Sequence, residues 1–275
     1  MVARIGVLVL AFGLWVVLVR VFNRMTGKAD ARKDPVTPAQ RRYLAFAAPL
    51  FLQNGDALHV FKSLMGTKAQ VSKVLRDWWY IKDRAGAIEA LESLTAGERH
   101  TSVADSVFTN IIKKGHTAPL SLETLRAIDG YAEADAGSLE EINHAIQCFN
   151  WLKSQLVRKI ELTESELLEI GSLAAWDYGR VGFIARYSAY AGYIDEDTAW
   201  NYMRVAGDRA ASAYSSWRQY YIAYYIGRTI AFVRTRTETE EQVGFLADLL
   251  NGNDIGIREL HGFPFKHQPL IPRTG

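Results

Sequence analysis

The strongest constraint on the fold is a spacing of three and four residues between apolar side chains, which recurs along much of the chain. No convincing alternation at a period of two, the pattern of a half-buried strand, accompanies it. We therefore predict an all-α fold, a compact multi-helix globular domain behind one apolar N-terminal helix. The clearest example, after Ser138, is the series Ile142, Ile146, Phe149, Leu152, Leu156 and Ile160.

Capping residues indicate where the helices begin. Ser138 and Thr163 are each followed three residues later by glutamate, which is the pattern of a capping box. Thr37 stands before a proline, and two acidic residues precede further helical segments. The predicted N-cap residues are Thr37, Asp83, Ser138, Thr163 and Asp195.

Two of these helix starts share a local pattern. The dipeptides Tyr80-Ile81 and Tyr193-Ile194 each lie just before an acidic N-cap. An aromatic and an aliphatic residue at this place predict a hydrophobic staple, which fixes the direction in which the chain enters the helix. The flanking residues do not match well enough to indicate a duplication.

The N-terminus carries a long apolar segment. Residues 5–19 contain no polar side chain, and residues 2–22 reach the length of about 20 residues that a bilayer requires if Arg4 and Arg20 extend to the interfaces. We predict a membrane anchor there. The alternatives are a helix packed on the domain and a cleaved signal peptide, which fits less well because the run meets Arg20 and Arg24 in place of a small-residue cleavage site.

Charge is distributed unevenly along the chain. Residues 1–36 carry six basic and two acidic side chains, a net +4, so the remainder of this chain of net charge +2 has −2. Because most basic residues follow the apolar segment, the positive-inside tendency places the body in the cytoplasm of a single-pass protein. A body so close to neutral argues against nucleic acid as a partner.

These patterns predict four regions. Residues 1–24 form the apolar helix, residues 25–37 a basic linker, residues 38–260 the helical globular domain, and residues 261–275 an extended tail. The tail contains three prolines, which favour extended backbone. It either docks on the body or stays free for a partner.

A dense polar and aromatic region begins in the helix predicted from Glu164 to about Ala191. Asp177 and Arg180 are three residues apart, so they can form an ion pair on one face, whereas Arg186 lies about 180° from Asp177 around the helix. Small residues at Gly171, Ala175, Gly179 and Gly182 line one face and predict that another helix approaches closely.

A second helix, predicted from about Ser215 to Arg234, carries Trp217, Tyr221, Tyr224 and Arg228 in one stripe. Its arginine can stack on a tyrosine or meet Asp177. Two interpretations stay open: a buried polar network that fixes helix register, or a pocket for an anionic group. The candidate residues are Trp176, Asp177, Arg180, Arg186, Ser216, Trp217, Tyr221 and Arg228.

Signatures of common catalytic sites are missing from the sequence. The six histidines show no metal-ligand spacing, and the glycine-rich and nucleophile-elbow motifs of nucleotide-binding proteins and hydrolases do not occur. Cys148, the single cysteine, lies in an apolar helical context that favours a buried small hydrophobe over a nucleophile. We predict neither a metal site nor a cofactor.

A series of aromatic, glycine and charged residues runs through this part of the chain: Trp79-Tyr80-Ile81, Trp176-Asp177, Gly179-Arg180, Arg186, Gly192-Tyr193-Ile194, Trp200, Ser216-Trp217 and Gly227-Arg228. This series resembles the bacterial family known as domain of unknown function 1266. The resemblance covers roughly residues 78–235 and implies a bacterial helical protein, hence an inner-membrane location for the anchor, without an established activity, substrate or cofactor.

Three functional hypotheses follow. The favoured one is a non-enzymatic, membrane-tethered helical module that binds a protein partner, since an anchor-like segment is present and no catalytic constellation is complete. The second is an enzyme or sensor that binds an anionic ligand at Asp177, Arg180 and Arg228. The third is an immunity-type inhibitor of a toxin.

Overall fold

The computed structural model describes residues 36–54, 56, 61, 67–97, 101–233, 235–251 and 265. Within these ranges the secondary structure is helical and no strand occurs, which confirms the predicted all-α class for this part of the chain. The apolar segment predicted over residues 2–22 lies outside the described residues. Among the helices that are described, none combines the length and hydropathy of a membrane span.

The chain divides into two compact units, each assembled from segments that are distant in the sequence. Unit 1 consists of Met1–Glu92, Gly179–Gly207 and Asp254–Phe263, and unit 2 of Ser93–Tyr178, Asp208–Asn253 and Pro264–Gly275. Helices α4 (Arg84–Ala96), α9 (Ala175–Ala191) and α10 (Glu196–Ala213) contribute residues to both units. The domain predicted over residues 38–260 thus contains residues of both.

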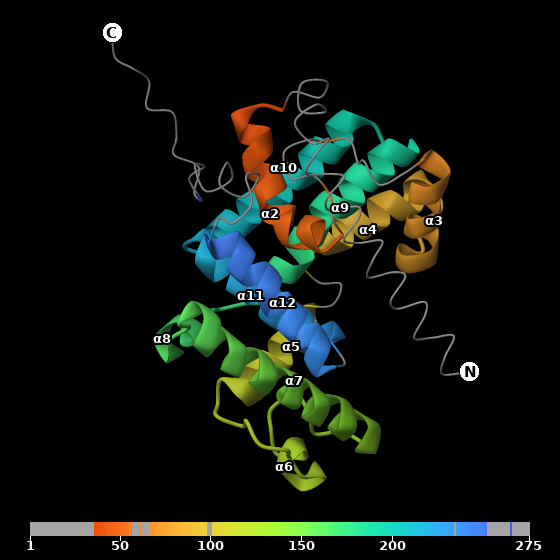
Figure 1. Ribbon diagram of the computed structural model, residues 1–275. Helices are drawn as coiled ribbons and strands as arrows, with labels where there is room; N and C mark the ends of the chain where they lie inside the picture. The colour runs from red at the N-terminus through yellow and green to blue at the C-terminus, as the bar shows by residue number, and fades with distance from the viewer. Residues whose placement is uncertain are drawn as a thin grey trace, which may run out of the picture. The chain divides into compact units, whose positions relative to one another are not determined.

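Unit 1 is built on α2 (Pro38–Asn54) and α3 (Lys68–Trp79), together with parts of α4, α9 and α10 (Figure 1). Two glycines bring helices close to α2. A Cβ atom on Gly182 of α9 would overlap the Cβ atom of Ala47, and one on Gly207 of α10 would lie 2.9 Å from a ring carbon of Tyr43. The close approach predicted from the small residues of α9 is therefore confirmed at Gly182.

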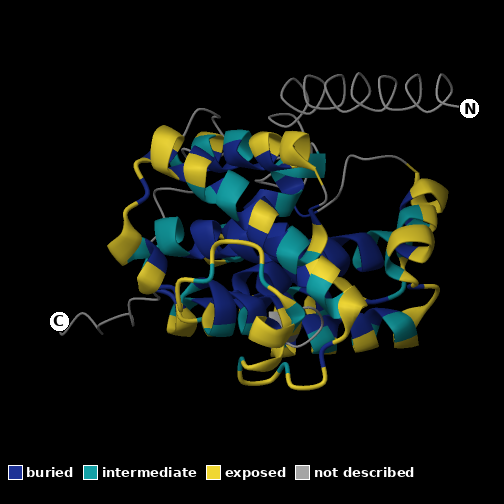
Figure 2. Ribbon diagram, turned by 90° about the horizontal axis from the view of Figure 1, so that it is seen from below, coloured by how far each residue is buried: buried dark blue, intermediate teal, exposed yellow. Residues whose placement is uncertain are grey.

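Unit 2 centres on α7 (Ala136–Ile160), α11 (Trp217–Phe232) and α12 (Arg236–Asn251), which contact one another (Figure 1). The six apolar residues predicted to share one face of α7 are all buried. Figure 2 shows buried and exposed residues alternating along individual helices, as amphipathic helices require. The remaining elements are α5 (Thr101–Ser106), the π-helix η1 (Val107–Ile112), α6 (Leu122–Arg126) and α8 (Glu164–Leu168).

Most predicted helix starts are confirmed by capping hydrogen bonds to the side chains of Thr37, Asp83, Thr163 and Asp195. The start predicted at Ser138 is wrong. The N-cap lies three residues earlier at Asp135, whose carboxylate accepts a hydrogen bond from the backbone N–H of Ser138 at 2.8 Å.

The single helix predicted from Glu164 to Ala191 is interrupted between α8 and α9. Asp105 accepts a hydrogen bond from the Ser172 hydroxyl at 2.9 Å and another from the backbone N–H of Leu173. Lys113 donates to the carbonyl of Ile170 at 3.1 Å. These partners are distant in sequence and hold the segment before α9 in a non-helical path, so Gly171 does not belong to the helix.

Candidate functional site

The candidate residues fall into two sets because α9 passes from one unit to the other. Arg180 and Arg186 belong to unit 1, and the other six belong to unit 2. All but Arg228 and the two residues at the start of α11 are buried.

Arg186 lies fully buried in unit 1. Its Nε donates to the carbonyl of Phe61 at 2.7 Å, and the centre of its guanidinium lies 4.2 Å from the ring centroid of Phe51. The next residue, Tyr187, donates its hydroxyl to the carboxylate of Asp56 at 3.2 Å. Buried charges of this kind need such partners, so this cluster is able to fix the positions of the segments that meet here.

Asp56 is a member of this cluster that the sequence did not indicate. Asp56 is only 4% exposed. It directly follows the glycine at position 55, and an aspartate beside a glycine usually lies in a solvent-exposed turn. No local pattern marks it, because its partner Tyr187 lies 131 residues later.

Arg180 is the second arginine of unit 1. It is buried, and its guanidinium carbon lies 5.9 Å from the ring centroid of Trp79 at the end of α3. The Trp79 ring also lies 5.9 Å from that of Phe183, one turn further along α9. The guanidinium is therefore positioned for a cation–π contact with a ring that packs against α9.

In unit 2, Trp176 and Asp177 occupy the buried first turn of α9. An acidic side chain at this place interacts favourably with the positive end of the helix dipole. A Cβ atom on Gly227 of α11 would lie 3.1 Å from the Cβ atom of Trp176, so the two helices are in close contact here. Arg228, the next residue, is partly exposed, and its guanidinium carbon lies 5.5 Å from the ring centroid of Phe232.

Tyrosine hydroxyls form hydrogen bonds with backbone N–H and carbonyl groups at the start of α9. Tyr214 accepts a hydrogen bond from the backbone N–H of Ala175 at 2.8 Å and donates to the carbonyl of Ser172 at 2.9 Å. Tyr220 donates to the carbonyl of Ala175 at 3.2 Å. Burial raises the pKa of both phenols well above the ordinary value, so they stay protonated donors.

The N-terminal turn of α11 holds an aromatic site, which we define as Trp217, Tyr220 and Tyr221. Ser216 caps the helix by accepting from the backbone N–H of Gln219 at 3.2 Å, and Trp217 stacks on Tyr221 with ring centroids 5.6 Å apart. The ring of Phe265 from the C-terminal region meets Trp217 edge-on, at 4.9 Å between centroids and an interplanar angle of 90°.

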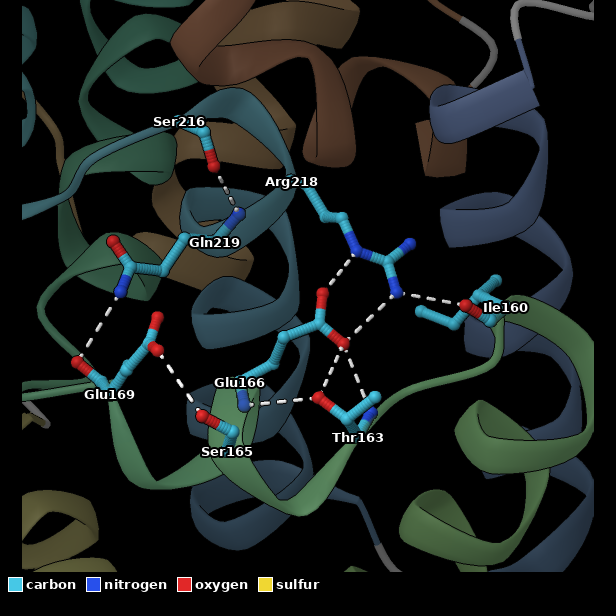
Figure 3. Close-up of polar contacts among 8 residues, drawn as sticks. All are labelled: Ile160, Thr163, Ser165, Glu166, Glu169, Ser216, Arg218 and Gln219. Atoms are coloured by element: carbon cyan, nitrogen blue, oxygen red, sulfur yellow. Dashed lines mark hydrogen bonds and ion pairs between the residues drawn. The ribbon is translucent and has the colours of Figure 1, made fainter.

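An ion pair fixes the same end of α11. Arg218 donates its Nε to Glu166 at 2.6 Å and another nitrogen to the carbonyl of Ile160 at 2.8 Å, while Glu166 also completes the capping box with Thr163 (Figure 3). The hydrogen bond from Arg218 is the main reason that the pKa of the Glu166 carboxyl is lowered from 4.5 to about 2. The carboxylate is thus ionised at any ordinary pH.

Two exposed aromatic rings at the end of α3 were not predicted from the sequence. Trp78 and Tyr80 at the end of α3 are 73% and 81% exposed, whereas Trp79 between them packs against Phe183 and Ile81 after them is buried. The hydrophobic staple predicted from Tyr80-Ile81 is therefore wrong for the tyrosine. The sequence signal for the exposure of Trp78 is the pair Trp78-Trp79, because two consecutive residues of a helix cannot both face the core.

Metal-ligating side chains do not gather in threes anywhere in the part of the chain that the structure describes. Cys148 is fully buried, with its sulfur 3.4 Å from a ring nitrogen of His144 and 3.6 Å from the carbonyl of Val233. The prediction of a buried small hydrophobe is confirmed by this burial.

Fold and site together define a helical protein with buried arginine and aromatic clusters in two units. Residues 74–261 match the family described as "Protein of unknown function (DUF1266)", and the chain belongs to this family. It is also similar to "Uncharacterized protein YbeR" of Escherichia coli (strain K12), with 39% identity over 59 residues. That stretch is 21% of this chain and only 25% of YbeR. No solved structure matches the chain significantly.

Proposed function

We propose that this protein is a non-enzymatic, membrane-tethered helical interaction module whose aromatic site on α11 binds a phenylalanine from an extended segment of a partner protein. The observation that supports this most strongly is the contact of Phe265 with Trp217 and Tyr220, at centroid distances of 4.9 and 6.2 Å. The site already holds a ring from the C-terminal region, and Phe265 is only 8% exposed.

The chemistry of Phe265 indicates what such a site prefers. An edge-to-face pair of aromatic rings contributes about 0.5–1.5 kcal/mol beyond the burial of its area. In the sequence Phe265 follows Pro264, whose ring restricts the backbone before binding. A proline-phenylalanine segment therefore loses little conformational entropy when it docks, which favours partners with the same pair of residues.

Phe265 also competes with any partner, because it belongs to the same chain as the site. A tethered segment has an effective concentration of the order of millimolar, so a free segment with the same contacts binds only weakly while Phe265 is in place. Removal of the Phe265 ring should strengthen binding of a partner segment, and removal of the Trp217 ring should abolish it.

The test uses a labelled peptide of residues 261–275 and the full chain in detergent. We expect the Phe265→Ala chain to bind this peptide at least about tenfold more tightly than the wild-type chain, since the competing ring is gone. The Trp217→Ala chain should not bind this peptide. The matched control is Phe232→Ala, which removes an exposed ring from the other end of α11 and should behave like the wild type.

A second arm changes only the peptide. A peptide with Phe265→Ala should lose its binding to the Phe265→Ala chain, which tests the ring contact without any effect on protein folding. Equal binding of the wild-type and mutant peptides would rule out the aromatic site. A partner protein captured from cells supports the proposal only if the wild-type peptide displaces it.

We further propose that residues 2–22 anchor the protein in the bacterial inner membrane in a single pass, with the body in the cytoplasm. The apolar run and the basic residues that follow it support this orientation. The protein should stay with membranes after an alkaline wash, and protease should cut the body in inside-out vesicles but not in intact spheroplasts. Recovery in the soluble fraction would contradict the anchor.

For the polar residues we propose a structural role in place of an anion pocket. The support comes from Arg186, whose buried guanidinium donates to a backbone carbonyl and lies over a phenyl ring, and from Arg180 beside Trp79. Asp177→Asn should lower the melting temperature, while phosphate- or carboxylate-bearing metabolites should leave that of the wild type unchanged. A ligand that stabilises the wild type and not Asp177→Asn would favour the pocket.

A further inference from the structure

The exposed rings at the end of α3 are held outward by the backbone. Tyr80 is the C-cap residue and has a left-handed conformation with φ of 59°, which is unfavourable for a residue other than glycine. The next residue, Ile81, donates its N–H to the carbonyl of Leu75 at 3.0 Å, and both side chains are buried. Because Ile81 returns to the core, the Tyr80 ring projects into solvent.

Trp78 adds a second large ring to the same edge. It is 73% exposed, although the next residue, Trp79, turns inward against Phe183. Rings of this size at such exposure are typical of contact surfaces. Tryptophan and tyrosine in particular are the residues that concentrate at the interface between membrane and water, where an apolar ring and a polar edge are both accommodated.

Basic residues are frequent in the sequence on either side of the two rings. Residues 67–84 contain five basic and two acidic residues, and all seven are exposed. Lys73 and Arg76 contact Asp77, and Arg84 lies 3.7 Å from Asp195. These ion pairs are solvent-exposed and contribute little to stability. The net charge of residues 67–84 is thus +3, and Asp195 beside Arg84 offsets one of these charges.

We propose that this aromatic edge, Trp78 and Tyr80 with the basic residues of 67–84, docks on a membrane surface that contains anionic lipid. The rings insert at the level of the headgroups while basic residues of the edge such as Lys82 meet lipid phosphates, which attract positive charge to an anionic surface. The lysines favour an anionic lipid surface over a protein partner, since lysine is depleted in protein interfaces.

The proposed anchor strengthens this contact without being required for it. The linker of residues 25–37 can span at most about 45 Å, so an anchored unit 1 always remains near the bilayer. Weak docking then suffices, because the tether supplies a high effective concentration. Docking would restrict how the body is presented to its partners.

The test uses the full chain in vesicles whose lipids carry bromine on the acyl chains, which quenches nearby tryptophan. The contribution of Trp78 is obtained by subtracting the tryptophan fluorescence of the Trp78→Phe chain from that of the wild type. We expect bromination to remove most of this difference in vesicles that contain phosphatidylglycerol, and to leave it in pure phosphatidylcholine or at high salt. The matched control is Trp151→Phe on α7, outside the proposed edge, whose fluorescence difference should be the same with and without bromine.

Charge variants test the lipid contact independently. Lys82→Glu should weaken the quenching of Trp78, and Lys159→Glu, an exposed lysine of α7, should not. Trp15 reports on the anchor separately, so quenched Trp15 with unquenched Trp78 would retain the anchor and overturn the docking. Loss of a specific protein partner on Trp78→Phe, without any lipid quenching, would identify the edge as a protein contact and also overturn the proposal.

Discussion

Two groups of aromatic side chains, one in each unit, differ in exposure. On α11 of unit 2, Tyr220, Tyr221, Tyr224 and Tyr225 are fully buried, whereas Trp78 and Tyr80 of unit 1 are mostly exposed. Tyr220 has a carbonyl acceptor at 3.2 Å and rings on several sides. The comparison teaches that residue type alone does not decide the role of a ring. What decides it is whether the surrounding helices supply both apolar contact and a partner for the polar end.

The largest effect should separate buried from exposed rings. Tyr220→Ala removes a ring that contacts Tyr214 and Trp217, so we expect a loss of about 3–5 kcal/mol in the free energy of unfolding. Trp78→Ala should change it by less than about 0.5 kcal/mol. Urea denaturation measures both, and a loss at Trp78 as large as at Tyr220 would break the comparison.

The ion pairs of the two units also differ in exposure, and variants that keep the helix caps measure the contribution of each pair. Glu166→Gln preserves the capping box but removes the charge that Arg218 binds, so a loss of about 1–2 kcal/mol is expected at neutral pH. Asp195→Asn in unit 1 likewise keeps a good N-cap and removes only an exposed partner of Arg84, so we expect a much smaller change in stability than for Glu166→Gln.

The same ion pair predicts a pH dependence. The pKa of Glu166 is lowered from 4.5 to about 2 in the folded protein. The stability from its carboxylate is therefore fully present above about pH 4.5 and is lost as the pH falls toward 2, when the folded protein takes up the proton. The difference between the wild type and Glu166→Gln should shrink over this range, and a difference that is constant with pH would exclude the ion pair as its cause.

The smallest effect concerns two helix ends of identical geometry. Tyr80 ends α3 and Glu161 ends α7, both left-handed, with φ of 59° and 54°. Glycine at either position should raise the stability by about 0.5–1 kcal/mol, because it removes the backbone strain. Only Tyr80→Gly should also weaken the quenching of Trp78 by brominated lipid. If Glu161→Gly weakened it equally, ring contact at the edge would not explain the docking.

Local patterns predicted the parts of the fold that depend on neighbours in sequence. The apolar stripe of α7 and the capping residue Thr163 are confirmed, because a helix face and a cap are decided within a few residues. The break between α8 and α9 was not predictable, since Asp105 and Lys113 stabilise it from more than 50 residues away. Asp56 was not predicted to be buried for the same reason, since its partner Tyr187 lies 131 residues later.

The candidate residues were found by their chemistry, but their surroundings were not. The sequence marked Arg186 and Trp217 as unusual, yet it contained no sign that Arg186 donates to Phe61 or that Phe265 meets Trp217. Both contacts join segments separated by long stretches of chain.

Apolar spacing and capping residues were enough to predict the helical class and most helix starts, because both act over one or two turns. The residues of the polar region also indicated the family. The assembly into two units, the burial of the tyrosines of α11 and the exposure of Trp78 and Tyr80 became clear only from the tertiary structure. Burial depends on contacts between distant segments, and no local pattern records which segments will meet.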